Sequence, residues 1–142
     1  MADKILVING PNLNLLGHRE KEIYGSMSLA EMEKRLKEMA EKEKVEIDFF
    51  QSNFEGEILE KIQGAREGYQ GIIINPAGLS YTSYSLVDAI RSLEIPVIEV
   101  HISHIFARGE NRTNSLTAPV CRGLISGLGW RGYLYAFLEL TS

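Results

Sequence analysis

Short apolar runs alternate along the chain with longer stretches in which apolar residues recur every three or four positions. The first pattern predicts strands buried on both faces, and the second predicts amphipathic helices. We expect strands at about 4–9, 45–50, 71–75, 97–101 and 120–126. We expect helices at about 28–44, 58–68, 82–93 and 130–140.

Local signals fix several of these boundaries. Ser28 and Glu31 form a capping box at the start of the first helix. Ser83 or Thr82 can cap the third helix, and Pro96 sets the start of the fourth strand. Strands that alternate with helices predict right-handed crossovers. The chain is therefore expected to form a flavodoxin-like α/β fold, a doubly wound five-stranded parallel sheet with helices on both faces.

The apolar runs end in polar residues that can carry chemistry. In an open parallel sheet, ligands bind in the crevice beyond the carboxyl ends of the strands. The first strand leads into residues 10–27, a segment rich in glycine and asparagine with little periodicity. Loops of this length inside a compact domain are commonly functional lids. A second polar excursion, at 104–115, follows the fourth strand.

Composition narrows the class of protein. The 142 residues suit one domain, 1–142, and the net charge of −4 argues against general binding to nucleic acid or to an anionic membrane. Cys121 is the single cysteine, no signal-peptide pattern precedes the first strand, and no apolar run approaches the roughly 20 residues that span a bilayer. We therefore expect a cytoplasmic protein. We expect no metal site, because no cluster of His, Cys or carboxylate residues has the spacing of metal ligands.

Glu99 and His101 are the first candidate pair for catalysis. They are two residues apart on one strand, so their side chains leave the same face. A buried carboxylate there would hold the imidazole in one tautomer and favour its protonated form, which makes His101 a candidate general acid. The alternative is a core pair that only satisfies itself, and the place at the strand end favours catalysis.

Tyr24 and Arg19 are the second candidate pair, both in the long loop. A tyrosine acts as a base near neutral pH only when its pKa falls about three units from ~10. A close guanidinium can supply that change, although desolvation opposes it. The alternative is that Tyr24 only anchors the loop by packing.

Two arginines and two asparagines complete the polar candidates. Arg108 and Arg112 are four residues apart and could present one cationic face, which suits oxyanions and hydroxyl pairs. Asn12 and Asn75 follow strand ends and offer both donors and acceptors. The alternative for the arginines is simple exposure to solvent, and the alternative for the asparagines is turn formation.

The sequence resembles the type II 3-dehydroquinate dehydratases over nearly its whole length. The matching segments are 9–17, 19–25, 49–53, 55–56, 74–76, 99–101 and 107–108. The resemblance implies a flavodoxin-like fold and the anti elimination of water from 3-dehydroquinate through an enolate, without a cofactor. It also implies a homo-oligomer, a dodecamer built from trimers. The product, 3-dehydroshikimate, belongs to the shikimate pathway of aromatic amino-acid biosynthesis or to quinate catabolism.

The resemblance also implies roles for individual residues. Tyr24 would be the base, Arg19 would lower its pKa, and His101 would protonate the leaving hydroxyl with Glu99 behind it. The resemblance further implies that Asn12 holds the enolate oxygen or a water, and that Asn75 and Arg112 bind the ring hydroxyls. It implies that Ile102 and Ser103 bind the substrate carboxylate.

Three features depend on comparison with the family pattern. Tyr81 stands where the family usually has a histidine that contacts a ring hydroxyl, and residues 109–111 lack one acidic and one aromatic residue of that pattern. Asp88 resembles the residue that reaches a neighbouring subunit's site. We place Asp88 on the apolar face of the third helix, where a carboxylate is costly without a partner.

Two other functions remain as alternatives. A non-catalytic flavodoxin-like module would hold a mononucleotide at the same crevice, but its phosphate cradle would need glycine and hydroxyl residues leading into a helix. Residues 12–16 offer amides and leucines instead. A hydrolase with Ser103 as nucleophile and His101 as base is the second alternative. No lysine follows Lys61, which leaves the later strand ends without an amine for a Schiff base.

Overall fold

The computed structural model describes residues 3–18, 20–109, 112 and 114–142. Its centre is a five-stranded parallel sheet with the strand order β2-β1-β3-β4-β5, which confirms the flavodoxin-like prediction. The strands are β1 (Lys4–Asn9), β2 (Glu46–Gln51), β3 (Gly71–Asn75), β4 (Val97–His101) and β5 (Gly123–Ser126).

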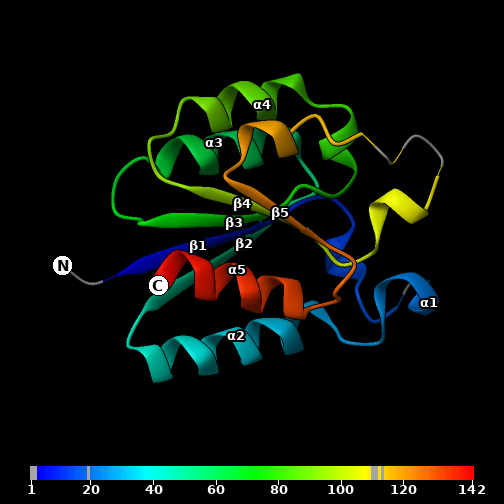
Figure 1. Cartoon of the computed structure of the whole chain (residues 1–142), viewed down its shortest axis with the longest axis horizontal. Coiled ribbons are helices and arrows are strands. Elements are labelled where there is room, and N and C mark those ends of the chain that lie inside the picture. The colour runs from blue at the N-terminus through cyan, green and yellow to red at the C-terminus, as the bar shows by residue number, and fades with distance from the viewer. Residues whose placement is uncertain (1–2, 19, 110–111, 113) are drawn as a thin grey trace.

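Helices cover both faces of the sheet (Figure 1). On one face lie α2 (Leu29–Glu43) and α5 (Arg131–Thr141), and on the other lie α3 (Glu55–Gly64) and α4 (Tyr84–Arg91). Strand β1 supplies apolar side chains to both layers, because alternate residues point to opposite faces. Its odd-numbered side chains join the core under α2 and α5, and its even-numbered ones join the core under α3 and α4. This explains why the strand is apolar without interruption.

The long loop after β1 contains short helical turns that the sequence pattern did not predict. A 3-10 turn covers Leu13–Leu15, and α1 covers Lys21–Tyr24. Leu13 and Leu16 are buried in the core under α2 and α5, so they anchor the start of the loop to the sheet. Tyr24, at the end of α1, is thereby carried back over the carboxyl ends of the strands.

The predicted helix caps are present. The Ser28 hydroxyl accepts a hydrogen bond from the Glu31 backbone N–H at 3.1 Å, and α2 begins at the next residue. At the third predicted helix, Ser83 is the cap, since its hydroxyl accepts from the Leu86 N–H at 3.0 Å. Thr82 does not fill that position.

Several element boundaries differ from the prediction for local reasons. Strand β2 begins at Glu46 because Lys44 adopts a left-handed conformation and the Val45 N–H donates to the Ala40 carbonyl, which keeps Val45 in the turn. The fifth strand begins three residues later than expected, after a 3-10 turn at Ala118–Val120. Helices α3 and α4 end at Gly64 and Arg91, a few residues earlier than expected.

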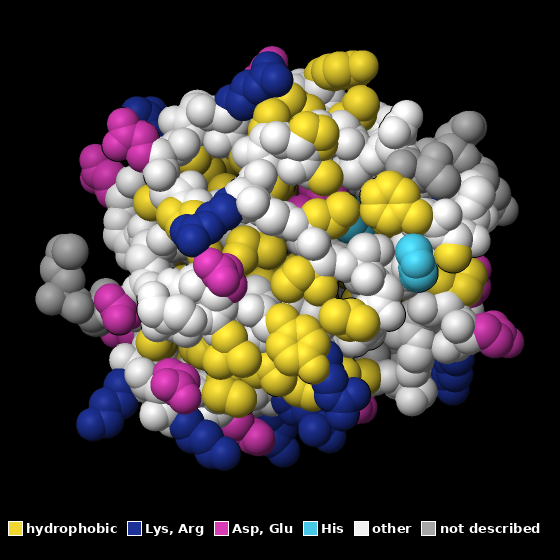
Figure 2. Space-filling model, in the orientation of Figure 1, with side chains coloured by type: hydrophobic (Ala, Val, Ile, Leu, Met, Phe, Trp, Pro, Cys, Tyr) yellow, Lys and Arg dark blue, Asp and Glu magenta, His cyan; other side chains and the backbone are white. Residues whose placement is uncertain are grey.

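Apolar side chains gather over the β5 and α5 side of the molecule (Figure 2). Strand β5 is the last strand of the sheet on this side. Tyr135 and Leu138 of α5 are both exposed. Charged side chains surround this apolar area in the same view.

Gly10 brings the end of β1 against the end of β3, and we predict that it cannot be enlarged without cost. Its N–H donates to the Asn75 carbonyl at 2.8 Å, and a Cβ would lie 2.5 Å from the Pro76 carbonyl oxygen. Gly10→Ala should therefore lower the free energy of unfolding by about 1–3 kcal/mol, measured by chemical or thermal denaturation. Gly64→Ala, where a Cβ meets nothing within 4 Å, is the control. Equal stabilities for the two variants would contradict the prediction.

Candidate active site

A pocket of about 110 Å³ opens at the carboxyl ends of β1, β3 and β4. Strands β1 and β3 are neighbours in the sheet, and the connections that leave them run to opposite faces, so a crevice forms between them. Most of the predicted site residues line this pocket: Asn12, Tyr24, Asn75, Tyr81, His101, Ile102, Ser103 and Arg112. The two polar loops predicted from the sequence therefore meet over the strand ends.

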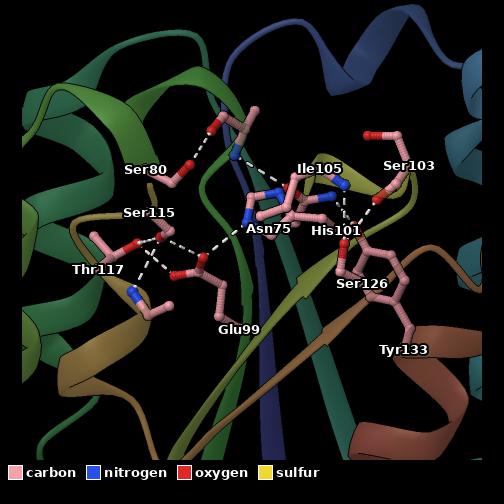
Figure 3. A network of polar contacts seen from close by, with 12 residues as sticks. Asn75, Ser80, Glu99, His101, Ser103, Ile105, Ser115, Thr117, Ser126 and Tyr133 are labelled. Atoms are coloured by element: carbon pink, nitrogen blue, oxygen red, sulfur yellow. Dashed lines mark hydrogen bonds and ion pairs between the residues drawn. The ribbon is translucent and has the colours of Figure 1, made fainter. Parts of the chain in front are cut away.

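Glu99 and His101 form a buried pair on β4 (Figure 3). The Glu99 Oε2 lies 2.7 Å from the His101 Nε2, as the two-residue spacing on one strand predicted. Since Nε2 is held by the carboxylate, Nδ1 is the ring nitrogen left for a ligand in the pocket. The pair thus fixes which atom of His101 can exchange a proton there.

Two hydroxyl groups complete the surroundings of Glu99. The Ser115 hydroxyl donates to Oε2 at 2.7 Å, and the Thr117 hydroxyl donates to Oε1. Both come from the segment that returns from the polar excursion toward β5 (Figure 3). A carboxylate that is fully buried is costly unless its oxygens accept hydrogen bonds, and these donors meet that need. Sequence reasoning missed them, because serine and threonine in a polar loop are common and carry no spacing signal.

Arg108 contacts Tyr24, which the sequence analysis did not predict. Its Nη1 donates to the Tyr24 hydroxyl oxygen at 2.7 Å and to the Ser103 hydroxyl at 3.2 Å. The guanidinium carbon also lies 5.2 Å from the centre of the Tyr24 ring. A guanidinium on the phenol oxygen stabilises a phenolate. The spacing of Arg108 and Arg112 was the available signal for this residue, and both arginines line the pocket.

Arg19, the predicted partner of Tyr24, lies outside the described residues. So do Glu110 and Asn111, which belong to the segment 109–111 that differs from the family pattern. The place of Arg19 beside Tyr24 therefore stays a prediction. Among the described residues, Arg108 is a cation that contacts the Tyr24 oxygen.

The two asparagines lie at the pocket in different ways. Asn12 is exposed, has a left-handed backbone with φ of 71°, and donates its N–H to the Asn53 Oδ1 at 2.9 Å. Asn75 is buried at the end of β3, where its Oδ1 accepts from the Ala77 N–H at 3.1 Å. Asn75 therefore combines turn formation with an amide that lines the pocket.

Tyr81 lies near the imidazole, with its ring centre 6.4 Å from that of His101. Burial raises the pKa of the Tyr81 phenol, while Arg112 and Arg108 nearby act in the opposite direction. The phenol is consequently neutral near pH 7. In that state it can donate one hydrogen bond to a ligand in the pocket.

Asp88 does not lie where the sequence analysis placed it. The buried face of α4 is formed by Leu86, Val87, Ala89 and Ile90, whereas Asp88 is exposed. The prediction of the apolar face was wrong because residues 86, 87, 89 and 90 all point to the core, and at about 3.6 residues per turn the residue in the middle of this set points the opposite way. Asp88 does not line the pocket described above.

Other classes of site find less support in the described part of the chain. Residues 3–18, 20–109, 112 and 114–142 contain no group of three or more His, Cys, Asp or Glu side chains arranged to hold a metal ion. No helix among them is long and apolar enough to cross a membrane. The Ser103 hydroxyl accepts from Arg108, and the His101 Nε2 faces Glu99, which does not favour a Ser–His hydrolase.

The chain thus has a doubly wound α/β fold with a pocket and a buried Glu–His pair at the strand ends, an arrangement typical of enzymes. The family model for class II dehydroquinases matches residues 3–141. A 3-dehydroquinate dehydratase of Endomicrobium trichonymphae is 52% identical over 139 residues, which cover 98% of this chain and 97% of that one. The chain belongs to the class II dehydroquinase family.

Solved structures agree with this assignment. The type II dehydroquinase from Butyrivibrio crossotus DSM 2876 superposes with a TM-score of 0.97 at 46% identity, covering 99% of both chains. That from Propionibacterium acnes has a TM-score of 0.95 at 38% identity, covering 99% of this chain and 97% of the other. The mononucleotide-binding alternative is not favoured, and β1 leads into a 3-10 turn rather than the start of a long helix.

Proposed function

We propose that the chain catalyses the anti elimination of water from 3-dehydroquinate, through an enolate, to give 3-dehydroshikimate. The observation that carries the proposal is the pair of reactive groups facing one pocket. Tyr24 lies on the loop 10–27, the proposed lid, and its hydroxyl oxygen accepts a hydrogen bond from Arg108. His101 lies at the end of β4, and its Nε2 contacts the Glu99 carboxylate. In this proposal, Tyr24 removes a proton and His101 delivers one.

In the proposed first step, the Tyr24 phenolate removes the proton from the carbon next to the ketone. The electron pair of that C–H bond becomes the enolate, whose oxygen Asn12 would hold directly or through a water. Arg108 stabilises the phenolate by its hydrogen bond to the oxygen. Arg19 would add a second cation on the same lid.

In the second step, the enolate collapses and the hydroxyl group at the neighbouring carbon leaves. His101 donates the Nδ1 proton to that oxygen, so that water departs. The Glu99 carboxylate compensates the charge of the imidazolium before the transfer, and it orients the ring throughout. The enolate route needs no amine, and no lysine is among the residues that line the described pocket.

The remaining polar groups would bind the substrate. Ile102 and Ser103 follow β4 directly and line the pocket, which supports the proposal that their backbone N–H groups and the Ser103 hydroxyl would bind the carboxylate. Arg108 adds positive charge at that end. Asn75 and Arg112 would bind ring hydroxyls. The reaction is a plain elimination, and we propose that it needs no cofactor.

We also propose that the chain assembles as a dodecamer built from trimers, in which Asp88 reaches a neighbouring site. Asp88 is exposed on α4, and the aromatic residues Phe54 and Tyr84, at the starts of α3 and α4, are among the most exposed of the large apolar side chains. These groups lie outside the sheet core and are available to another copy. Light scattering would measure the assembled mass. The cytoplasmic location expected from the sequence is a separate prediction, which cell fractionation would test.

The activity is tested by adding 3-dehydroquinate to the purified protein and following the absorbance of the conjugated product. Product formation without added metal or nucleotide is expected. The mononucleotide-binding alternative predicts no turnover and a bound flavin or other nucleotide, visible in the absorption spectrum of the purified protein.

We expect Tyr81 to act as a substrate-binding residue. Tyr81→His replaces one hydrogen-bond donor by another at the edge of the pocket. One neutral hydrogen bond contributes about 0.5–1.5 kcal/mol, so the variant should change KM by about threefold to tenfold and leave kcat almost unchanged. Steady-state kinetics measure both. A hundredfold fall in kcat with an intact fold would show instead that Tyr81 takes part in the chemistry.

A further inference from the structure

A buried chain of hydrogen bonds joins the end of β1, helix α5 and the end of β3 behind the pocket. The Asn75 Nδ2 donates to the Tyr133 hydroxyl oxygen at 2.9 Å, and the Tyr133 hydroxyl donates to the Asn9 Oδ1 at 2.6 Å. All three side chains are at least 97% buried, and Tyr133 and Asn9 have no exposed surface. Figure 3 shows Tyr133 reaching from α5 toward the sheet.

The direction of these hydrogen bonds is determined by the backbone. The Ala77 N–H donates to the Asn75 Oδ1, so the amide nitrogen of Asn75 must face Tyr133. The Tyr133 oxygen therefore accepts from Asn75, and its own proton goes to Asn9. Burial raises the pKa of Tyr133, which keeps that proton in place. Tyr133 is thus held by a partner on each side of its hydroxyl.

Asn9 provides evidence that the chain of bonds is specific. Its Nδ2 is buried and has no hydrogen-bond partner among the described residues. An unsatisfied buried donor is costly, so an amide at this position needs a compensating role. The bond that its Oδ1 accepts from Tyr133 is such a role.

We infer that Tyr133 is a positioning residue of the substrate site, acting through the Asn75 amide. One N–H of the Asn75 Nδ2 is used by Tyr133, which leaves the other for a substrate hydroxyl in the pocket that Asn75 lines. The inference rests on the proposed function, in which Asn75 binds a ring hydroxyl. Without the Tyr133 oxygen, the Asn75 amide is held by the Ala77 N–H on its Oδ1, and its nitrogen loses the buried partner that fixes the angle of the second N–H toward the substrate.

The test compares Tyr133→Phe with the unchanged protein in the dehydration assay. Loss of one neutral hydrogen bond behind Asn75 should raise KM by about threefold to tenfold and leave kcat within about twofold. Tyr69→Phe is the matched control, because it removes a tyrosine hydroxyl that donates to Asp48 at 2.6 Å, and neither residue lines the pocket. That control should leave both constants unchanged.

A double-variant cycle separates positioning from general stability. If Tyr133 acts through Asn75, Tyr133→Phe should have no further effect on KM once Asn75 is replaced by alanine. Asn9→Ala tests the same chain of hydrogen bonds from its other end and should also raise KM. This variant serves as the test if Tyr133→Phe does not fold. Additive effects in the cycle, or an unchanged KM in Tyr133→Phe, would overturn the inference while the activity itself stands. Absence of dehydration by the unchanged protein would instead overturn the proposed function.

Discussion

Tyr24→Phe is expected to lose nearly all turnover while the protein stays folded and still binds substrate. In the proposed mechanism the substitution removes the oxygen that accepts the proton, and a positioned general base contributes about 10²–10⁴-fold to the rate. Tyr24 is partly exposed on the lid, so its oxygen adds little to the stability of the sheet. We therefore expect kcat to fall at least a hundredfold, with KM changed by a few-fold at most, in steady-state assays.

The control is Tyr135→Phe, which removes a tyrosine hydroxyl from a residue that is 44% exposed on α5 and does not line the pocket. It should retain full activity. Circular dichroism and thermal unfolding should show both variants to be folded like the unchanged protein. Turnover within tenfold of normal in a folded Tyr24→Phe variant would show that another group takes the proton.

The fold could be predicted because burial on both faces leaves a clear pattern. The runs at 4–9, 71–75 and 97–101 coincide with β1, β3 and β4, because strands between two helical layers are mostly apolar between their ends, with the buried Glu99 of β4 as the exception. Boundaries set by a single backbone angle could not be predicted in the same way. The left-handed Lys44 and the 3-10 turn at 118–120 are examples, and both depend on how the chain meets the sheet.

The candidate site was predictable where it depends on spacing along a strand. Glu99 and His101 must share a face whatever the loops do, and the structure has them in contact. The contact of Arg108 with Tyr24 joins residues 84 positions apart and depends on the path of two loops. Ser115 and Thr117 reach Glu99 for the same kind of reason. Periodicity contains no information about such contacts.

Glu99→Gln should be nearly as damaging as the loss of the base, although it keeps the size of the side chain. The amide oxygen can still accept from the His101 Nε2, and the amide nitrogen can donate to the Thr117 oxygen, because that hydroxyl can turn. What disappears is the negative charge beside a buried imidazole. The His101 proton would then be held at an imidazolium without a counter-charge in a site of low dielectric constant, which is unfavourable.

We expect kcat to fall about 10²–10⁴-fold in Glu99→Gln, the range of general acid catalysis, with a smaller change in KM. Thr117→Val is the matched control, because it removes a neutral donor to the same carboxylate and keeps the charge. It should lose much less activity, although it leaves Glu99 with one hydrogen bond fewer. Stopped-flow or steady-state assays at neutral pH compare the two. If Glu99→Gln folds normally and keeps more than a tenth of the activity, the charge of Glu99 is not needed and His101 is only held in place by it.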